Sequence, residues 1–151
     1  MLLRWWRQFA DDIEVLLDRF ALTVRCRHGV EVVRPIVFVS AGSPTVRVLA
    51  VGAPSGVSGP YTQLDVFDPA PVAEHGLTRE QGLELVLRYG IARLRHGFVF
   101  LRPEITFSGS MGVADVFAPS GRAALVLAAN HLGARKVNFA STGSGIKPED
   151  V

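Results

Sequence analysis

The chain has 151 residues, of which 48% are hydrophobic and 20% charged, a balance typical of one globular domain with a sizeable core. Its net charge of +2, without any long run of like charges, disfavours a nucleic-acid partner. The single cysteine, Cys26, excludes an internal disulfide and favours the cytoplasm, and no apolar stretch reaches the length of a membrane-spanning helix. We therefore expect any membrane contact to be peripheral.

Residues 1–10 (MLLRWWRQFA) predict an amphipathic helix, because their apolar side chains fall on one helical face and the arginines on the other. Tryptophan favours the membrane–water interface, and arginine can meet anionic lipid headgroups. The alternative is that the same apolar face packs into the core or against a partner protein. The residues assigned to membrane binding are Leu2, Leu3, Arg4, Trp5, Trp6, Arg7 and Phe9.

The next part of the chain predicts a sheet of hairpins. Extended segments are expected at residues 13–17, 21–26, 32–40 and 47–51, with a turn at His28–Gly29 and an interruption at Pro35. Residues 52–71 hold three glycines and four prolines, so we expect them to be mostly loop.

The second half of the chain predicts helices alternating with strands. Thr78 and Gln81 form a capping-box pattern that begins a helix over 78–96, which Gly97 ends. A strand over 104–108, a helix over 120–132 and a strand over 136–140 predict a β-α-β unit with parallel strands. The fold class is therefore α/β, a mixed sheet with flanking helices in one domain over 11–140, followed by a polar tail over 141–151.

No motif of a metal site, a hydrolase or a nucleotide-binding loop is present, and the four histidines are too far apart in sequence for metal-ligand spacing. Two Ser/Gly stretches, 108–112 and 141–145, follow predicted strands and offer backbone N–H groups to an anion. Neither opens directly into a predicted helix, which favours ordinary loops. We assign no catalytic residue, metal or cofactor.

Five segments in collinear order resemble the MreB family of bacterial actins. They are MLLRWWRQFADDIEVLLD (1–18), AGSPTVRVLAVG (41–52), VAEHGLTREQGLELVLRYGI (72–91), LRPEITF (101–107) and GRAALVLAANHLGARKV (121–137). The resemblance implies the N-terminal half of an actin fold, that is, a ribonuclease H-like first domain with a small hairpin and loop insertion.

The sequence departs from that family where the family carries its first phosphate loop, Gly-Ile-Asp-Leu-Gly-Thr-Ala-Asn. The corresponding run here is EVLLDRFA (14–21), in which a leucine replaces the aspartate and acidic residues replace both glycines. Acidic side chains would obstruct the close approach of a phosphate and repel its charge. The residues of this degenerate nucleotide loop are Glu14, Leu16, Asp18, Arg19 and Ala21.

The resemblance and its departures together imply a non-catalytic, actin-like cytoskeletal module without ATPase activity, involved in cell shape or filament interaction. It would be cytoplasmic and peripheral at the inner face of the cell membrane. The expected partners are anionic lipid and a protein, either a second copy or an actin-like filament. One alternative is an ATP-binding, MreB-like cell shape-determining protein, or a fragment of one, that needs a second chain to complete its cleft. Another is a small α/β ligand-binding domain with only architectural similarity to actins.

Overall fold

The computed structural model describes residues 12–27, 29–41, 45–69, 76–94, 102–117 and 119–140. The predicted N-terminal helix, the polar tail and the helix stop at Gly97 lie outside these residues. The strands are β1 (Ile13–Leu17), β2 (Leu22–Cys26), β3 (Gly29–Val33), β4 (Ile36–Ser40), β5 (Val48–Val51), β6 (Tyr61–Asp65), β7 (Glu104–Gly109) and β8 (Lys136–Phe139). The helices are α2 (Arg79–Leu94), α3 (Gly121–His131) and the short 3-10 helix η1 (Met111–Val116).

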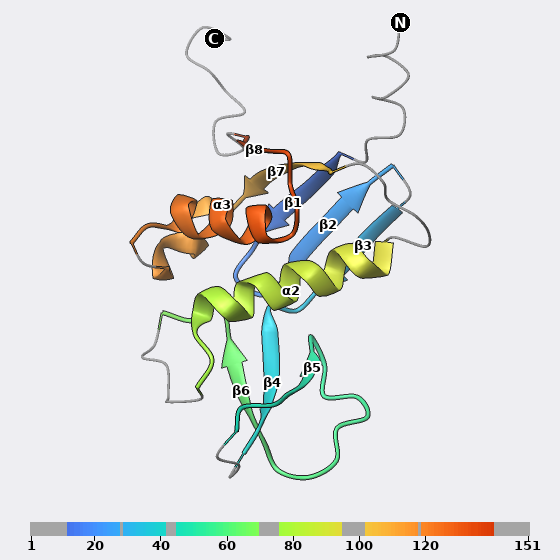
Figure 1. The fold of residues 1–151 in the computed structure, drawn as a ribbon, viewed down its shortest axis with the longest axis vertical. Helices are drawn as coiled ribbons and strands as arrows, with labels where there is room; N and C mark the ends of the chain where they lie inside the picture. Colours follow the sequence, from blue (N-terminus) through green and yellow to red (C-terminus); the bar gives the residue numbers. More distant parts are fainter. Residues whose placement is uncertain are drawn as a thin grey trace, which may run out of the picture.

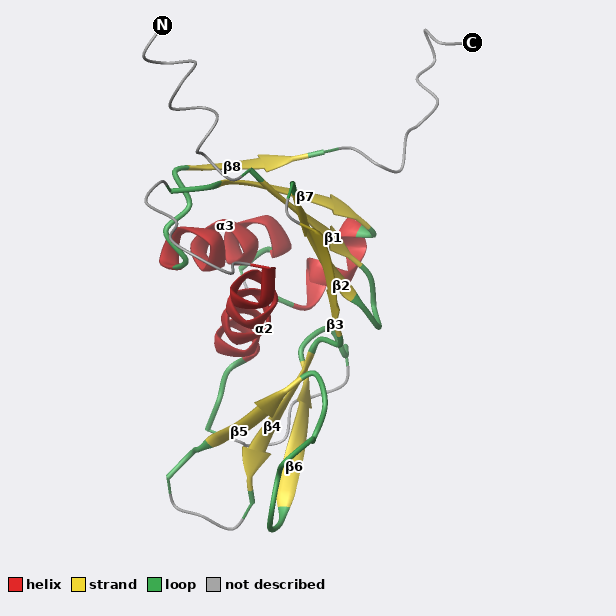
Figure 2. Ribbon diagram, turned by 90° about the vertical axis from the view of Figure 1, so that its right-hand side faces the viewer, coloured by secondary structure: helices red, strands yellow, loops and turns green. Residues whose placement is uncertain are grey.

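The larger of two sheets has the strand order β3-β2-β1-β7-β8. β1, β2 and β3 pair antiparallel, whereas β7 runs parallel to both β1 and β8, so the sheet is mixed. Both α2 and α3 lie on one face of this sheet (Figures 1 and 2). The predicted α/β class and the parallel β-α-β unit are therefore confirmed.

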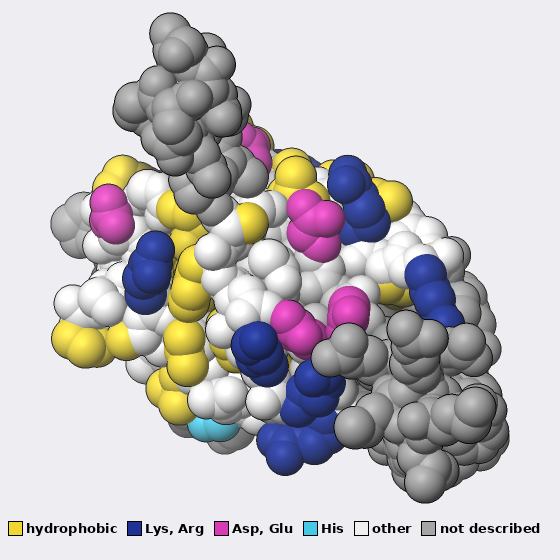
Figure 3. Space-filling model, turned by 90° about the horizontal axis from the view of Figure 1, so that it is seen from above, with side chains coloured by type: hydrophobic (Ala, Val, Ile, Leu, Met, Phe, Trp, Pro, Cys, Tyr) yellow, Lys and Arg dark blue, Asp and Glu magenta, His cyan; other side chains and the backbone are white. Residues whose placement is uncertain are grey.

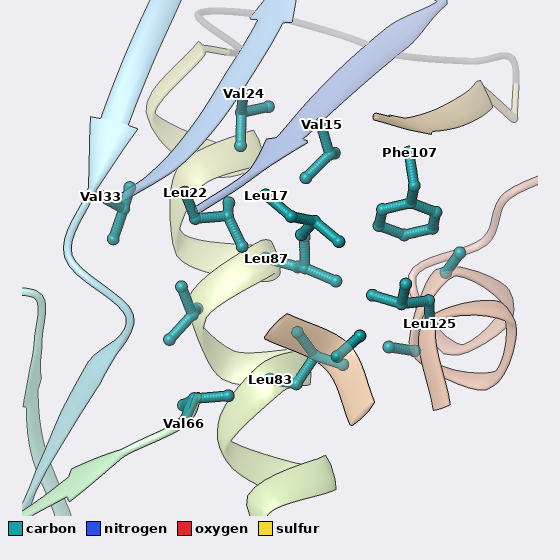
Figure 4. Close-up of a cluster of buried hydrophobic side chains, with 14 of the residues drawn as sticks. Val15, Leu17, Leu22, Val24, Val33, Val66, Leu83, Leu87, Phe107 and Leu125 are labelled. Carbon is teal, nitrogen blue, oxygen red and sulfur yellow. The ribbon is translucent and has the colours of Figure 1, made fainter. Parts of the chain in front are cut away.

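The core lies between this sheet and its two helices. Alternate residues of β1, such as Val15 and Leu17, are buried, as the two-residue period of a strand with one covered face requires. They point towards Leu87 of α2 and Leu125 of α3 (Figure 4). The opposite face of the sheet, which bears Glu14, Leu16 and the other alternate residues, is covered by no helix among the described residues.

The smaller sheet has the order β5-β4-β6 and forms the expected hairpin insertion (Figure 1). Pro35 divides the predicted 32–40 segment, so that β3 ends in one sheet and β4 begins the other. Most of the described residues in 52–69 are loop, as expected, but β6 also lies within this segment. Tertiary pairing decides this segment: β6 pairs with β4 along its whole length and buries Leu64.

Local signals position the remaining elements. Thr78 N donates to Gln81 Oε1 at 2.9 Å and Gln81 N donates to Thr78 Oγ1 at 3.1 Å, which is the predicted reciprocal capping box at the start of α2. Gly29, which the sequence places in a turn, already pairs with Cys26 as the first residue of β3, and His28 lies outside the described residues. Within the part of the chain that the structure describes, no helix is long and apolar enough to cross a membrane.

Candidate functional site

The β1–β2 turn, residues 18–21, lies where the parallel strands β1 and β7 end. Carboxyl ends of parallel strands are the usual location of ligand sites in α/β sheets. In this turn the Asp18 carboxylate accepts a hydrogen bond from Phe20 N at 3.1 Å, which closes the turn on itself. Ala21 is half-buried and leads into β2, whereas the Phe20 ring is 72% exposed.

Arg19 connects this turn to the smaller sheet through ion pairs. Its Nη1 lies 2.9 and 3.0 Å from the two carboxylate oxygens of Asp65 at the end of β6, and its Nη2 lies 3.7 Å from Asp68. The guanidinium also lies over the Phe20 ring, 5.0 Å from its centroid. The one cation of the turn is thus already neutralised by carboxylates of the same chain. Asp65 and Asp68 thus bring two carboxylates to one guanidinium, and this excess of negative charge disfavours phosphate.

Glu14 and Leu16 lie within β1 on the sheet face that faces away from the helices. Glu14 Oε1 accepts a hydrogen bond from Ser108 Oγ at 3.4 Å, and its other oxygen lies 3.8 Å from Arg25 Nη1. Leu16 is opposite Ser108 in the β1–β7 register. Of the five residues predicted to form a degenerate nucleotide loop, the structure places two in the strand and three in the turn.

The Ser/Gly stretch 108–112 is used for packing. Ser110 N donates to Leu17 O at 2.8 Å, so this backbone donor is not available to an anion. Gly109 has a φ of +89°, and a Cβ there would lie 2.5 Å from Leu17 O. The expectation that no helix follows this stretch directly is wrong, because η1 begins at Met111, although it is a 3-10 helix of only six residues. The second stretch, 141–145, lies outside the described residues.

Sequence reasoning missed the partner of Arg19. From the sequence, Asp65 and Asp68 can be read only as a pair of loop carboxylates, because Asp65 is 46 residues from Arg19. The pairing of β4 with β6 brings Asp65 to Arg19 in the fold. No local pattern could have indicated this contact.

Among the described residues no three metal-ligating side chains come together. His131, at the end of α3, has its Nδ1 2.9 Å from the Glu84 carboxylate of α2.

Comparisons with known proteins place this fold in the actin-like class. No protein-family model matches the sequence, and a search of curated proteins finds no significant match. Among solved structures, the chain is similar to MreB 5 of Spiroplasma citri bound to AMPPNP, with a TM-score of 0.63 and 14% sequence identity. The match covers 91% of this chain but 42% of that chain, so this chain spans less than half the length of the bacterial actin.

Proposed function

We propose that this chain is a non-catalytic, actin-like module that works at the inner face of the cell membrane and engages a protein partner in cell shape or filament organisation. The actin-like fold supports the cytoskeletal class. The observation that carries the non-catalytic part is the Arg19–Asp65 pair, which occupies the turn where the resemblance to bacterial actins would require an open phosphate loop.

The chemistry of that turn is the reverse of a phosphate site. A phosphate loop presents unpaired backbone N–H groups and glycines that allow close approach. Here the Phe20 N–H is bonded to Asp18, and the Arg19 guanidinium is bonded to Asp65. A nucleotide at this turn would have to break both interactions and then lie beside the carboxylates that they release. The proposed mechanism is therefore binding without turnover.

The membrane part of the proposal rests on the sequence of residues 1–10. Viewed from the end of the molecule at which β8 lies, basic and acidic side chains are interspersed (Figure 3). Arg135 at this end, for example, lies 3.3 Å from Glu104 and 3.4 Å from Asp12. The described residues on this side therefore present charges of both signs, and we attribute the attraction to anionic lipid mainly to Arg4 and Arg7.

We expect the double substitution Arg4→Gln and Arg7→Gln to weaken binding to vesicles that contain phosphatidylserine. Each arginine near an anionic surface contributes about 1 kcal/mol, so the loss should be roughly 30-fold at low salt. This loss of affinity should be smaller at about 1 M salt, where the Debye length falls to about 3 Å. Vesicle sedimentation across a salt series measures this loss.

The matched control removes the same charge elsewhere, through Arg88→Gln and Arg122→Gln on the exposed faces of α2 and α3. The control should bind vesicles like the unaltered chain. An equal loss in both double variants, or binding by the unaltered chain that ignores salt, would contradict the assignment.

A second candidate function is an ATP-binding actin-like protein that needs another chain to complete its cleft. It is favoured by the similarity to a structure bound to AMPPNP, of which this chain covers 42%. The two candidates differ in the affinity of this chain for nucleotide, which titration with magnesium-ATP measures.

A further inference from the structure

β3 is an outer strand of the larger sheet, and no described strand lies beyond it. Val30 and Val32 are 54% and 62% exposed on the face turned away from the helices. Exposed apolar edge strands promote pairing with other chains, and proteins usually protect them with lysine, proline or a bulge. The only charged residue of β3, Glu31, points instead towards α2, where its carboxylate lies 3.2 Å from Arg93 Nε.

The β2–β3 register shows which backbone groups of β3 face outwards. Cys26 pairs with Gly29, so two residues connect the strands, and the pair that flanks a two-residue connection is a hydrogen-bonded one. Hydrogen-bonded pairs then alternate, which turns the N–H and C=O groups of Glu31 towards β2. The N–H and C=O groups of Val30 and Val32 therefore point away from the sheet.

We propose that β3 pairs antiparallel with β3 of a second copy of this chain. A two-fold axis at Glu31 places Val30 of each copy opposite Val32 of the other. The outward N–H and C=O groups of these two residues then exchange hydrogen bonds between the copies. The four valines then form one apolar cluster on the open face, and the two larger sheets become continuous. Such an interface is isologous, because the same strand serves both copies.

The charges at this edge permit the pairing. Glu31 of one copy would lie beside Glu31 of the other, and like charges directly opposite each other normally destabilise a sheet. Each carboxylate is already paired with Arg93 of its own copy at 3.2 Å. Arginine is charged at physiological pH, and the guanidinium of Arg93 is held in place by the hydrogen bonds that it donates to Glu31 and Tyr89.

The self-complementary register favours a second copy over a different protein as the occupant of this edge. One pair of five-residue strands is smaller than a standard interface of about 1,600 Å², so the dimer should be weak in solution. It would strengthen where copies are held close together, because effective concentration replaces free concentration.

Sedimentation equilibrium of the full chain, from about 10 μM to about 1 mM, tests the proposal. The unaltered chain should show a monomer–dimer equilibrium, and Val32→Lys should weaken it at least about tenfold by placing a charge in the valine cluster. The matched control is Leu127→Lys, because Leu127 on α3 is 52% exposed but distant from β3 in the fold. It should dimerise like the unaltered chain. A chain that stays monomeric throughout, or a dimer that Val32→Lys leaves unchanged, would overturn the proposal.

A cross-link tests the register independently. In this register Glu31 of one copy lies opposite Glu31 of the second copy in a non-hydrogen-bonded pair. The Cα atoms of such a pair are about 4.5 Å apart, which is within disulfide range. Glu31→Cys in a Cys26→Ser background should therefore give a covalent dimer under mild oxidation. Leu127→Cys in the same background should stay monomeric, and equal cross-linking of both variants would overturn the register.

Discussion

Replacing Trp5 and Trp6 together with alanine is expected to lower the affinity of the chain for anionic vesicles at least about 100-fold. Burial of a large apolar side chain contributes about 1.5–3 kcal/mol, so two rings at the interface contribute at least about 3 kcal/mol. Each 1.4 kcal/mol corresponds to about a factor of ten in the dissociation constant. Sedimentation with vesicles of fixed composition measures the change.

The control for this double variant is Phe20→Ala, which removes a 72% exposed ring from the described part of the chain. Phe20→Ala should bind vesicles like the unaltered chain, and the melting temperature of the double tryptophan variant should be unchanged. If the double variant binds as the unaltered chain does, the tryptophans are not membrane anchors. If it unfolds at a much lower temperature, the two rings belong to the protein core.

Gly109→Ala is expected to destabilise the fold by about 3 kcal/mol. Gly109 has a φ of +89°, and left-handed backbone costs an L-residue about 1–2 kcal/mol. The new methyl group would also lie 2.5 Å from Leu17 O and 2.9 Å from Leu17 N, so β1 and β7 would have to move apart. For a chain of this size the melting temperature should fall by about 6–12 °C. Calorimetric and denaturant unfolding both measure this loss.

Gly59 offers a matched control, because it has the same φ of +89° but no neighbouring atom within 4 Å of the position that a methyl group would take. Gly59→Ala should therefore cost only the conformational term, about 1–2 kcal/mol. The difference between the two variants isolates the close approach to β1. Equal losses would mean that Gly109 is not required for packing, and its place in a Ser/Gly stretch would then need another explanation.

The elements with strong local signals are predictable from the sequence. The Thr78–Gln81 capping box sets the start of α2, and Ser120 caps α3 through its hydrogen bond with Ala123 N at 3.2 Å. The apolar run at residues 13–17 likewise predicts β1. These signals depend on neighbours within four residues, so the sequence alone is enough to predict them.

Features that depend on distant pairing are not predictable in this way. β6 lies in a segment whose glycines and prolines indicate loop. It forms a strand because it pairs with β4, in which Phe38 is the partner of Gln63, some 25 residues later in the chain. The Arg19–Asp65 contact depends in turn on that pairing. The degenerate phosphate loop at the β1–β2 turn stays a prediction from the composition of residues 14–21, whereas the contact between Arg19 and Asp65 is visible only in the fold.

Isothermal titration of magnesium-ATP into the 151-residue chain tests the proposed loss of nucleotide binding most directly. Because Arg19 is held by Asp65 and the turn is lined with carboxylates, we expect a dissociation constant no lower than about 1 mM, close to −4 kcal/mol of binding free energy. Saturable heat with a micromolar dissociation constant for this chain alone would contradict the non-catalytic assignment and favour a working nucleotide site.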